Sequence, residues 1–233
     1  MTTPRITAIR THLMQAGPLG ATAWGDVKAS ITTGTRNWLF VTVETDAGIT
    51  GIGEGSGWPR VVDAAVQDLA HVLVGEDAFG IERLTQRMRV AMMGHGVSGV
   101  VGAGAISAID MALWDIKGKA LGVPVWQLLG GRVRERIRCY AHASTPEQAK
   151  DAVARGYTAI KTGGVAMPVA KAQAIRDAVG PEVDVMIDLH GPPWLTLPDA
   201  ISITRALGEL RPLWVEEPLP PENMDGYRAL RRA

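Results

Sequence analysis

The second half of the chain repeats one pattern, in which a short apolar stretch is followed by a turn and a helical stretch. Four such repeats begin at about residue 135, and each apolar stretch has the length of a buried strand. Strands that alternate with helices form parallel βαβ units, because two parallel strands need a crossover connection. The repeat length is nearly constant, since 27 residues separate Lys161 from Asp188 and 28 separate Asp188 from Glu216. This regularity predicts a parallel sheet built from successive βα units.

The predicted elements of this half follow one another with short connections. Thr145 is a suitable N-cap for the first helix, and Gly156 is a suitable end for it. In chain order, strands and helices are predicted at 136–144, 145–156, 157–164, 168–180, 183–191, 197–210, 213–220 and from 224 onward. Cys139 falls in the first strand, where we expect a small buried residue beside Tyr140.

The first part of the chain follows a different pattern, with antiparallel strands followed by helices, as in an α+β domain. Residues 37–55 alternate apolar and polar side chains on both sides of a turn at 46–48, which predicts a hairpin. Helical periodicity follows at 59–74, 80–93 and 104–122. Gly122 and Pro124 are expected to end the last of these helices.

Composition disfavours several classes of protein. The 233 residues include 24 basic and 24 acidic side chains, so the zero net charge argues against a nucleic-acid-binding surface. Gly, Asp or Lys interrupts each apolar stretch before it reaches the length of a membrane span, and the N-terminus lacks the apolar segment of a signal peptide. The single cysteine excludes an internal disulfide framework and fits a reducing compartment. We expect a cytoplasmic protein that binds neither nucleic acid nor membrane.

Charged side chains mark the carboxyl ends of successive predicted strands, the edge at which parallel sheets bind ligands. They are Lys161, Asp188, His190 and Glu216 or Glu217. Asp188 and His190 share one face of their strand, because they are two residues apart. Two carboxylates from neighbouring strands suit a hard cation such as Mg²⁺. Lys161 could stabilise an anion, or act as a base if its pKa is depressed.

Each of these residues also has a structural interpretation. Asp188 could cap a helix or a turn, Glu216 and Glu217 could form a solvated corner, and Lys161 could belong to a surface ion pair. The recurrence of charged groups at one-repeat spacing, at one end of the sheet, favours a functional site over these alternatives.

Three stretches resemble the enolase superfamily, and within it the mandelate racemase and muconate lactonizing enzyme group. They are "AISAIDMALWDIKGKALGVPVWQLLGG" at 105–131, "VEEP" at 215–218, and Asp188 on the preceding strand. The resemblance covers the whole chain. It implies an α+β capping domain over residues 1–131, followed over residues 132–233 by the first half of a modified (β/α) barrel of the TIM type, in which parallel strands alternate with helices.

The resemblance also implies roles for individual residues. It identifies Asp188 and Glu216 as Mg²⁺ ligands and leaves Glu217 out of the ligand set. Strand parity is consistent with this assignment, since Glu216 shares a face with Trp214 and Pro218.

One departure from the family pattern narrows the range of reactions that the resemblance allows. Many members carry Lys-x-Lys at the end of the second barrel strand, with the second lysine as base, whereas this chain has Gly163 at that position. A racemase or cycloisomerase that depends on this lysine is therefore disfavoured. The stretch "DLHG", with His190 two residues after Asp188, is similar to acid-sugar dehydratases of the galactonate type. The resemblance implies that His190 delivers a proton to the leaving hydroxyl and that Lys161 stabilises the carboxylate end of the substrate.

The implied activity is that of a lyase in carbohydrate acid catabolism. Water would be eliminated from a sugar acid through an Mg²⁺-stabilised enediolate, giving a 2-keto-3-deoxy acid. Two alternatives stay open. One is a racemase or epimerase of a hydroxy acid that uses a histidine from a later strand, and the other is a non-catalytic truncated homologue.

The remaining expectations concern ligands and residues outside this group of charged side chains. The third metal ligand is expected one repeat after Glu216, which is beyond Ala233, so the 233-residue chain alone is expected to be inactive or weakly active. A full-length form is expected to be a homo-oligomer. The Gly- and Thr-rich segment 17–36 corresponds to a capping-domain loop that sets substrate choice in the family. Trp24, Arg36 or Asn37 could contact the substrate, with packing an equal alternative, and we take Asn37 as the candidate substrate-binding residue.

Overall fold

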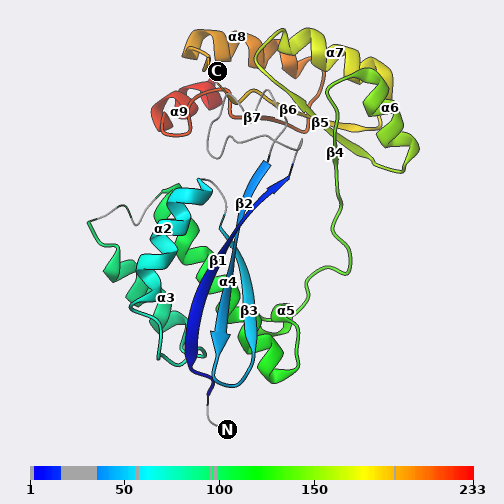
Figure 1. Ribbon diagram of the computed structural model, residues 1–233. Helices are drawn as coiled ribbons and strands as arrows, with labels where there is room; N and C mark the ends of the chain where they lie inside the picture. Colours follow the sequence, from blue (N-terminus) through cyan, green and yellow to red (C-terminus); the bar gives the residue numbers. More distant parts are fainter. Residues whose placement is uncertain (1–2, 17–35, 56–57, 95, 97–98, 192) are drawn as a thin grey trace. The chain divides into compact units, whose positions relative to one another are not determined.

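The structure is a computed structural model, and it describes residues 3–16, 36–55, 58–94, 96, 99–191 and 193–233 (Figure 1). The chain divides into two compact units, Met1–Val133 and Arg134–Ala233. None of the helices in the described ranges is long and apolar enough to cross a lipid bilayer.

Unit 1 contains a three-stranded antiparallel sheet in the order β1 (Ile6–Ala16), β2 (Arg36–Thr45) and β3 (Thr50–Gly55). The hairpin predicted at 37–55 is confirmed as β2 and β3, and β1 adds a third strand alongside β2. At the turn Gly48 has a φ of 71°, a left-handed conformation that glycine adopts without steric cost. The Thr45 hydroxyl donates to the Ile49 carbonyl at 2.8 Å and helps to close the turn.

The helices of unit 1 follow the predicted periodicity. They are α2 (Pro59–Ala70), α3 (Ile81–Ala91), α4 (Val100–Leu121) and the short α5 (Val125–Leu128). The predicted end of α4 is confirmed, because Gly122 has a φ of 67° and its N–H bonds to the Gly118 and Lys119 carbonyls. Helix α4 lies so close to β3 that a Cβ on Gly53 would stand 1.8 Å from the Ala108 carbonyl oxygen.

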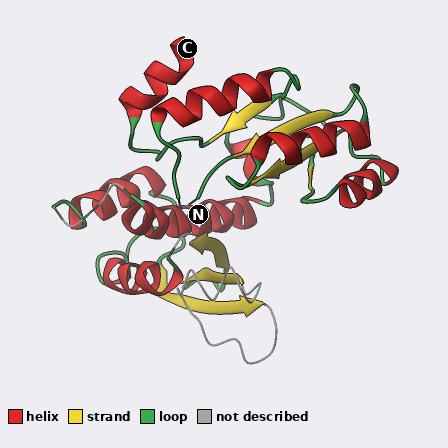
Figure 2. Cartoon of the chain, turned by 90° about the horizontal axis from the view of Figure 1, so that it is seen from above, coloured by secondary structure: helices red, strands yellow, loops and turns green. Residues whose placement is uncertain are grey.

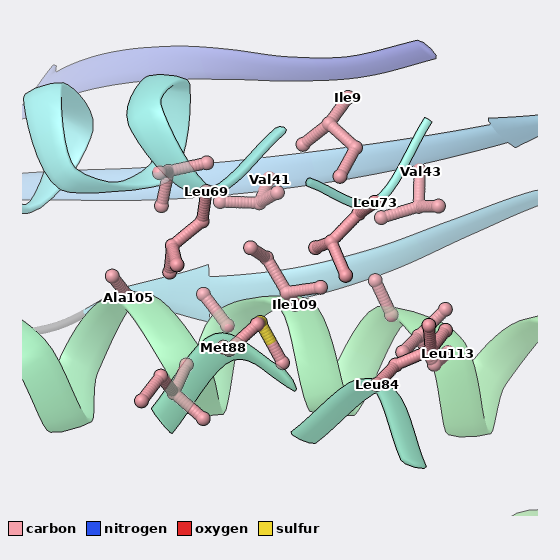
Figure 3. Packing of buried hydrophobic residues seen from close by; sticks show 14 of the residues in the cluster. Ile9, Val41, Val43, Leu69, Leu73, Leu84, Met88, Ala105, Ile109 and Leu113 are labelled. Atoms are coloured by element: carbon pink, nitrogen blue, oxygen red, sulfur yellow. The ribbon is translucent and has the colours of Figure 1, made fainter. Parts of the chain in front are cut away.

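The core of unit 1 lies between its sheet and its helices. Apolar side chains from the sheet meet those from three helical segments in one cluster (Figure 3). The members labelled there are Ile9, Val41, Val43, Leu69, Leu73, Leu84, Met88, Ala105, Ile109 and Leu113. Their burial stabilises the fold of unit 1.

Unit 2 is the parallel α/β structure that the repeat predicted, and its helices and strands alternate in Figure 2. The four strands lie side by side in chain order and are parallel. The elements are β4 (Ala141–His142), α6 (Pro146–Ala154), β5 (Ala159–Gly163), α7 (Pro168–Val179), β6 (Asp184–Asp188), α8 (Leu197–Gly208), β7 (Trp214–Glu216) and α9 (Met224–Arg232). The expected fold class, a capping α+β unit and the opening strands of a (β/α) barrel, is thereby confirmed.

Two local features of unit 2 have clear sequence origins. The predicted cap at Thr145 is confirmed, because its side chain accepts a hydrogen bond from the Gln148 N–H. Thr196 caps α8 in the same way, through the Asp199 N–H. Apolar side chains such as Ile160 and Ile187 form a second core between the strands and the helices.

The expectation for Cys139 was wrong, since this side chain is exposed. The strand predicted over 136–144 is formed only at residues 141–142, where β4 pairs with β5 at the edge of the sheet. Residues 136–140 form no ladder in the part of the chain that the structure describes, and Ile137 is 82% exposed. Without a neighbouring strand, the apolar pattern of this segment does not bury its side chains.

Candidate metal centre

Neighbouring strands bring the predicted charged residues to one edge of the unit 2 sheet. The register places Asp188 opposite Gly163 of β5 and opposite Glu216 of β7. The ladder continues past these pairs, because the Leu189 N–H donates to the Glu216 carbonyl at 2.8 Å. Lys161 lies two residues before Gly163, on the same face of β5. Lys161, Asp188 and Glu216 are therefore placed together by strand pairing alone.

The Lys161 ammonium lies between the two carboxylates. Its Nζ is 2.9 Å from Asp188 Oδ2 and 2.8 Å from Glu216 Oε1. The side chains of Lys161 and Asp188 are only 15% and 11% exposed, so the alternative of a surface ion pair is wrong. Burial on its own would lower the pKa of Lys161, but the bonds to both carboxylates outweigh it and raise that pKa. In this geometry the two carboxylates therefore favour the charged form of Lys161.

Asp188 is also bonded to His190 through its other oxygen. Asp188 Oδ1 accepts the backbone N–H of His190 at 3.0 Å and lies 2.7 Å from the ring Nδ1. Burial would raise the pKa of Asp188, but the bonds from Lys161 and His190 lower it below its ordinary value. The His190 side chain is 61% exposed, so its ring can reach a molecule outside the sheet edge while Asp188 holds one of its nitrogens.

The second carboxylate oxygen of Glu216 accepts a hydrogen bond from a tryptophan. Trp214 Nε1 donates to Glu216 Oε2 at 3.1 Å, so these two residues of β7 share a face, as strand parity predicted. Glu216 is the most exposed of the three paired charges, with 35% of its side chain accessible.

Glu217, which the sequence offered at this edge as the alternative to Glu216, also reaches it, although the family resemblance leaves it out of the ligand set. The ligand atoms of Asp188, His190 and Glu217 all lie within 4.8 Å of one another in the described residues. Parity would turn Glu217 away from Glu216, but its φ of 45° departs from the extended backbone and redirects the side chain. The sequence signal for such a departure is weak, because a residue before proline normally stays extended.

The donor set fits the cation that the fold implies. Two carboxylates from adjacent strands already surround a positive group, the Lys161 ammonium, at hydrogen-bonding distance. Carboxylate oxygens are the ligands that Mg²⁺ prefers. Asp188 and Glu216 could therefore hold a hard divalent cation, with Lys161 next to it.

Gly163 leaves no room for the second lysine of the Lys-x-Lys pattern. A Cβ at this position would stand 2.2 Å from the Asp188 carbonyl oxygen and 3.0 Å from the Asp188 Cβ. The glycine is thus required by the close approach of β5 and β6 at the residue that carries the candidate ligand.

Asn37, the candidate substrate-binding residue, belongs to unit 1. It lies near the start of β2, half-buried, opposite Gln15 of β1. Residues 17–35, including Trp24, and the Arg36 side chain lie outside the described part of the chain. A substrate contact by Asn37 stays a prediction.

Two family descriptions match most of the chain. "Mandelate racemase / muconate lactonizing enzyme, N-terminal domain" matches residues 21–130, and "Enolase C-terminal domain-like" matches residues 144–233.

Curated relatives agree with these matches. A D-galactonate dehydratase of Variovorax paradoxus (strain S110) is 40% identical over 213 residues, and one of Xanthomonas oryzae pv. oryzae (strain PXO99A) is 41% identical over the same length. Each alignment covers 83% of this chain and 55% of the relative. The chain therefore spans about half the length of the curated relatives that it matches.

Solved structures give the same result. The 3,6-anhydro-D-galactonate cycloisomerase of Zobellia galactanivorans superposes with a TM-score of 0.85 and 33% identity, over 98% of this chain and 62% of that one. A member of the enolase superfamily from Salmonella Typhimurium has a TM-score of 0.81 and 30% identity, over 97% of this chain and 64% of that one. Together with the site geometry, these matches show that the chain belongs to the mandelate racemase and muconate lactonizing enzyme group of the enolase superfamily.

Proposed function

We propose that this chain provides two metal ligands and a general acid for an Mg²⁺-dependent acid-sugar dehydratase, a lyase. The observation that supports this proposal most strongly is the arrangement around Asp188. One of its oxygens faces the Lys161 ammonium and Glu216 beyond it, and the other holds His190. In this proposal residues 1–131 form the capping domain, and residues 132–233 contribute the first four barrel strands.

Asp188 and Glu216 would hold the cation. Bound Mg²⁺ would supply a Lewis acid that stabilises negative charge on the substrate carboxylate as the α-proton passes to a base on a later barrel strand, which the family resemblance implies. Lys161 adds a fixed positive charge beside the same carboxylate, at a position that is shielded from water and therefore electrostatically strong. The raised pKa of Lys161 supports this electrostatic role.

His190 would donate a proton to the departing hydroxyl. Its Nδ1 is held by Asp188, which leaves Nε2 as the ring atom available to a substrate. An imidazolium whose Nδ1 is held by a carboxylate presents its Nε2–H outward and is suited to general acid catalysis. The ring is exposed, so it does not need to move out of a core to do so.

The names of the relatives support a sugar-acid substrate of the galactonate kind. An isomerase is the second candidate, because one similar structure is a cycloisomerase of an anhydrogalactonate. The steric conflict at Gly163 argues against the version of that chemistry that uses the second lysine of Lys-x-Lys. The homo-oligomeric state and the cytoplasmic location stay predictions from the sequence.

Calorimetric titration of the 233-residue chain with Mg²⁺ tests the metal assignment. We expect measurable binding that is lost in Asp188→Asn, whereas Asp225→Asn should leave it unchanged, because Asp225 is an exposed acid in α9 that pairs with Arg228. Equal binding by both variants and the unchanged chain would contradict the metal assignment.

A chimera tests the chemistry. This chain would be joined to the remaining C-terminal part of the Variovorax paradoxus relative and assayed with D-galactonate for a 2-keto-3-deoxy product. We expect His190→Ala to stop dehydration and to leave exchange of the α-proton with D₂O measurable. If the variant loses both reactions, His190 has a structural or ligand role. If only an isomerised acid accumulates with the unaltered chimera, the enzyme is an isomerase and the dehydratase proposal is wrong.

A further inference from the structure

The indole of Trp214 makes the only polar contact to Glu216 Oε2 that is found among the described residues. Glu216 Oε1 is bonded to Lys161, and Oε2 accepts from Trp214 Nε1 at 3.1 Å. The two contacts hold both oxygens of one carboxylate from different directions. Because an indole N–H can only donate, Trp214 can hold an ionised Glu216 without competing for a cation.

A second aromatic ring restrains the indole. Tyr140 meets Trp214 with their ring planes at 82° and their centroids 6.5 Å apart, an edge-to-face arrangement. Tyr140 precedes β4, whereas Trp214 lies in β7, and two strands separate these elements in the sheet. The sheet must therefore curve enough to bring residues near its two edges into contact on one face.

The pair combines a ring contact with a polar contact. Trp214 is 41% exposed and Tyr140 is 47% exposed in the described part of the chain. The described polar contact of the indole is directed at the candidate metal ligand. The edge-to-face contact with Tyr140 restrains the plane of the indole ring and therefore the direction in which its N–H points.

We propose that Trp214 is a positioning residue that orients the Glu216 carboxylate toward the cation, and that Tyr140 holds Trp214 in place. This inference rests on the proposed function, because it takes Glu216 as a metal ligand. Partners of metal ligands typically change metal affinity by 10–100-fold when they are removed. The exposure of Trp214 places the expected effect near the lower end of this range.

Metal affinity gives the first test. Mn²⁺ is added to the 233-residue chain, and the free ion is measured by electron paramagnetic resonance. We expect Trp214→Phe to weaken binding about tenfold, since it keeps a ring and removes the N–H. Trp126→Phe is the matched control, because Trp126 is 39% exposed in α5 of unit 1, and it should leave affinity unchanged. Tyr140→Leu should weaken Mn²⁺ binding, because it removes the ring that contacts Trp214. Tyr140→Phe should bind Mn²⁺ like the unaltered chain, because it keeps that ring.

A metal-free measurement separates this inference from the proposed function. The indole N–H resonance of Trp214 is identified by its absence in Trp214→Phe. We expect it to shift, and to exchange faster with water, in Glu216→Ala. If that resonance is unchanged, or if Trp214→Phe binds Mn²⁺ like the unaltered chain, the positioning role is overturned. If the unaltered chain binds no Mn²⁺ but the resonance responds to Glu216→Ala, the metal assignment fails while the indole contact to Glu216 stands.

Discussion

Gly163 and Asp188 face each other across β5 and β6 with no space for a side chain between them. A Cβ on Gly163 would lie 2.2 Å from the Asp188 carbonyl oxygen, far inside van der Waals contact. The Gly164 N–H donates to that same carbonyl at 2.8 Å, so the Asp188 backbone is held in place from β5. The absence of a side chain at residue 163 therefore determines where the candidate metal ligand sits.

Gly163→Ala should accordingly displace Asp188. We expect a loss of about 1–3 kcal/mol in the free energy of unfolding, as for other overpacked sites, together with weaker Mg²⁺ binding. Gly208→Ala is the control, because apart from its own helix and its chain neighbours no atom of the described chain lies within 4 Å of the position of its Cβ at the end of α8. Urea unfolding and calorimetry measure both effects. Equal stability of the two variants would show that β5 and β6 can separate without cost.

Removing the cation between the carboxylates should destabilise the metal-free chain. Lys161→Met removes the cation beside the buried Asp188 carboxylate, which then keeps only its bonds to His190, at a cost of about 3 kcal/mol. Arg228→Met breaks an ion pair whose side chains are 67% and 92% exposed, and it should cost less than about 0.5 kcal/mol. Thermal unfolding in EDTA compares the two variants. Added Mg²⁺ should then raise the melting temperature of Lys161→Met more than that of the unaltered chain.

The lowered pKa of Asp188 predicts how stability depends on pH. Since that pKa is lower in the folded chain than in the unfolded one, ionised Asp188 stabilises the fold above its unfolded pKa of about 4. The contribution disappears as the pH falls through the folded-state pKa. In EDTA, the difference in unfolding free energy between the unaltered chain and Asp188→Asn should therefore shrink from pH 6 toward pH 3. A difference that stays constant over this range contradicts the assignment.

The two adjacent glutamates can be distinguished by substitution. If Glu216 is the ligand, Glu216→Gln should weaken Mg²⁺ binding at least about tenfold, whereas Glu217→Gln should change it less than about twofold. Calorimetric titration of both variants decides between them. The opposite order would assign the cation to the group formed by Asp188, His190 and Glu217.

Much of the site could be predicted because strand pairing follows simple rules. Spacings of 27 and 28 residues place Asp188 beside the end of β5 and Glu216 beside Asp188, as the register confirms. Parity along β7 likewise predicted that Trp214 and Glu216 share a face. These relationships depend only on backbone periodicity and on the order of the strands.

The features that could not be predicted depend on departures from regular strand geometry and on side-chain conformation. The direction of the Glu217 side chain could not be predicted, because the alternation of faces along a strand fails once a residue adopts a φ of 45°. Cys139 was expected to be buried because its neighbours have strand-like composition, but burial requires a partner strand. The position of the Lys161 ammonium between two carboxylates is a matter of side-chain geometry, which spacing alone does not determine.

The order of the strands in unit 2 has a consequence for how the charges of the site come together. Each strand pairs with the one before it in the chain, and the charges of the site come from three successive strands. Domains can fold from the amino-terminal side during synthesis. If the strands of unit 2 join the sheet in chain order, we expect the Lys161–Asp188 pair to form before Glu216 reaches the sheet edge. The ammonium would then already be in place to neutralise the second carboxylate as that carboxylate becomes buried.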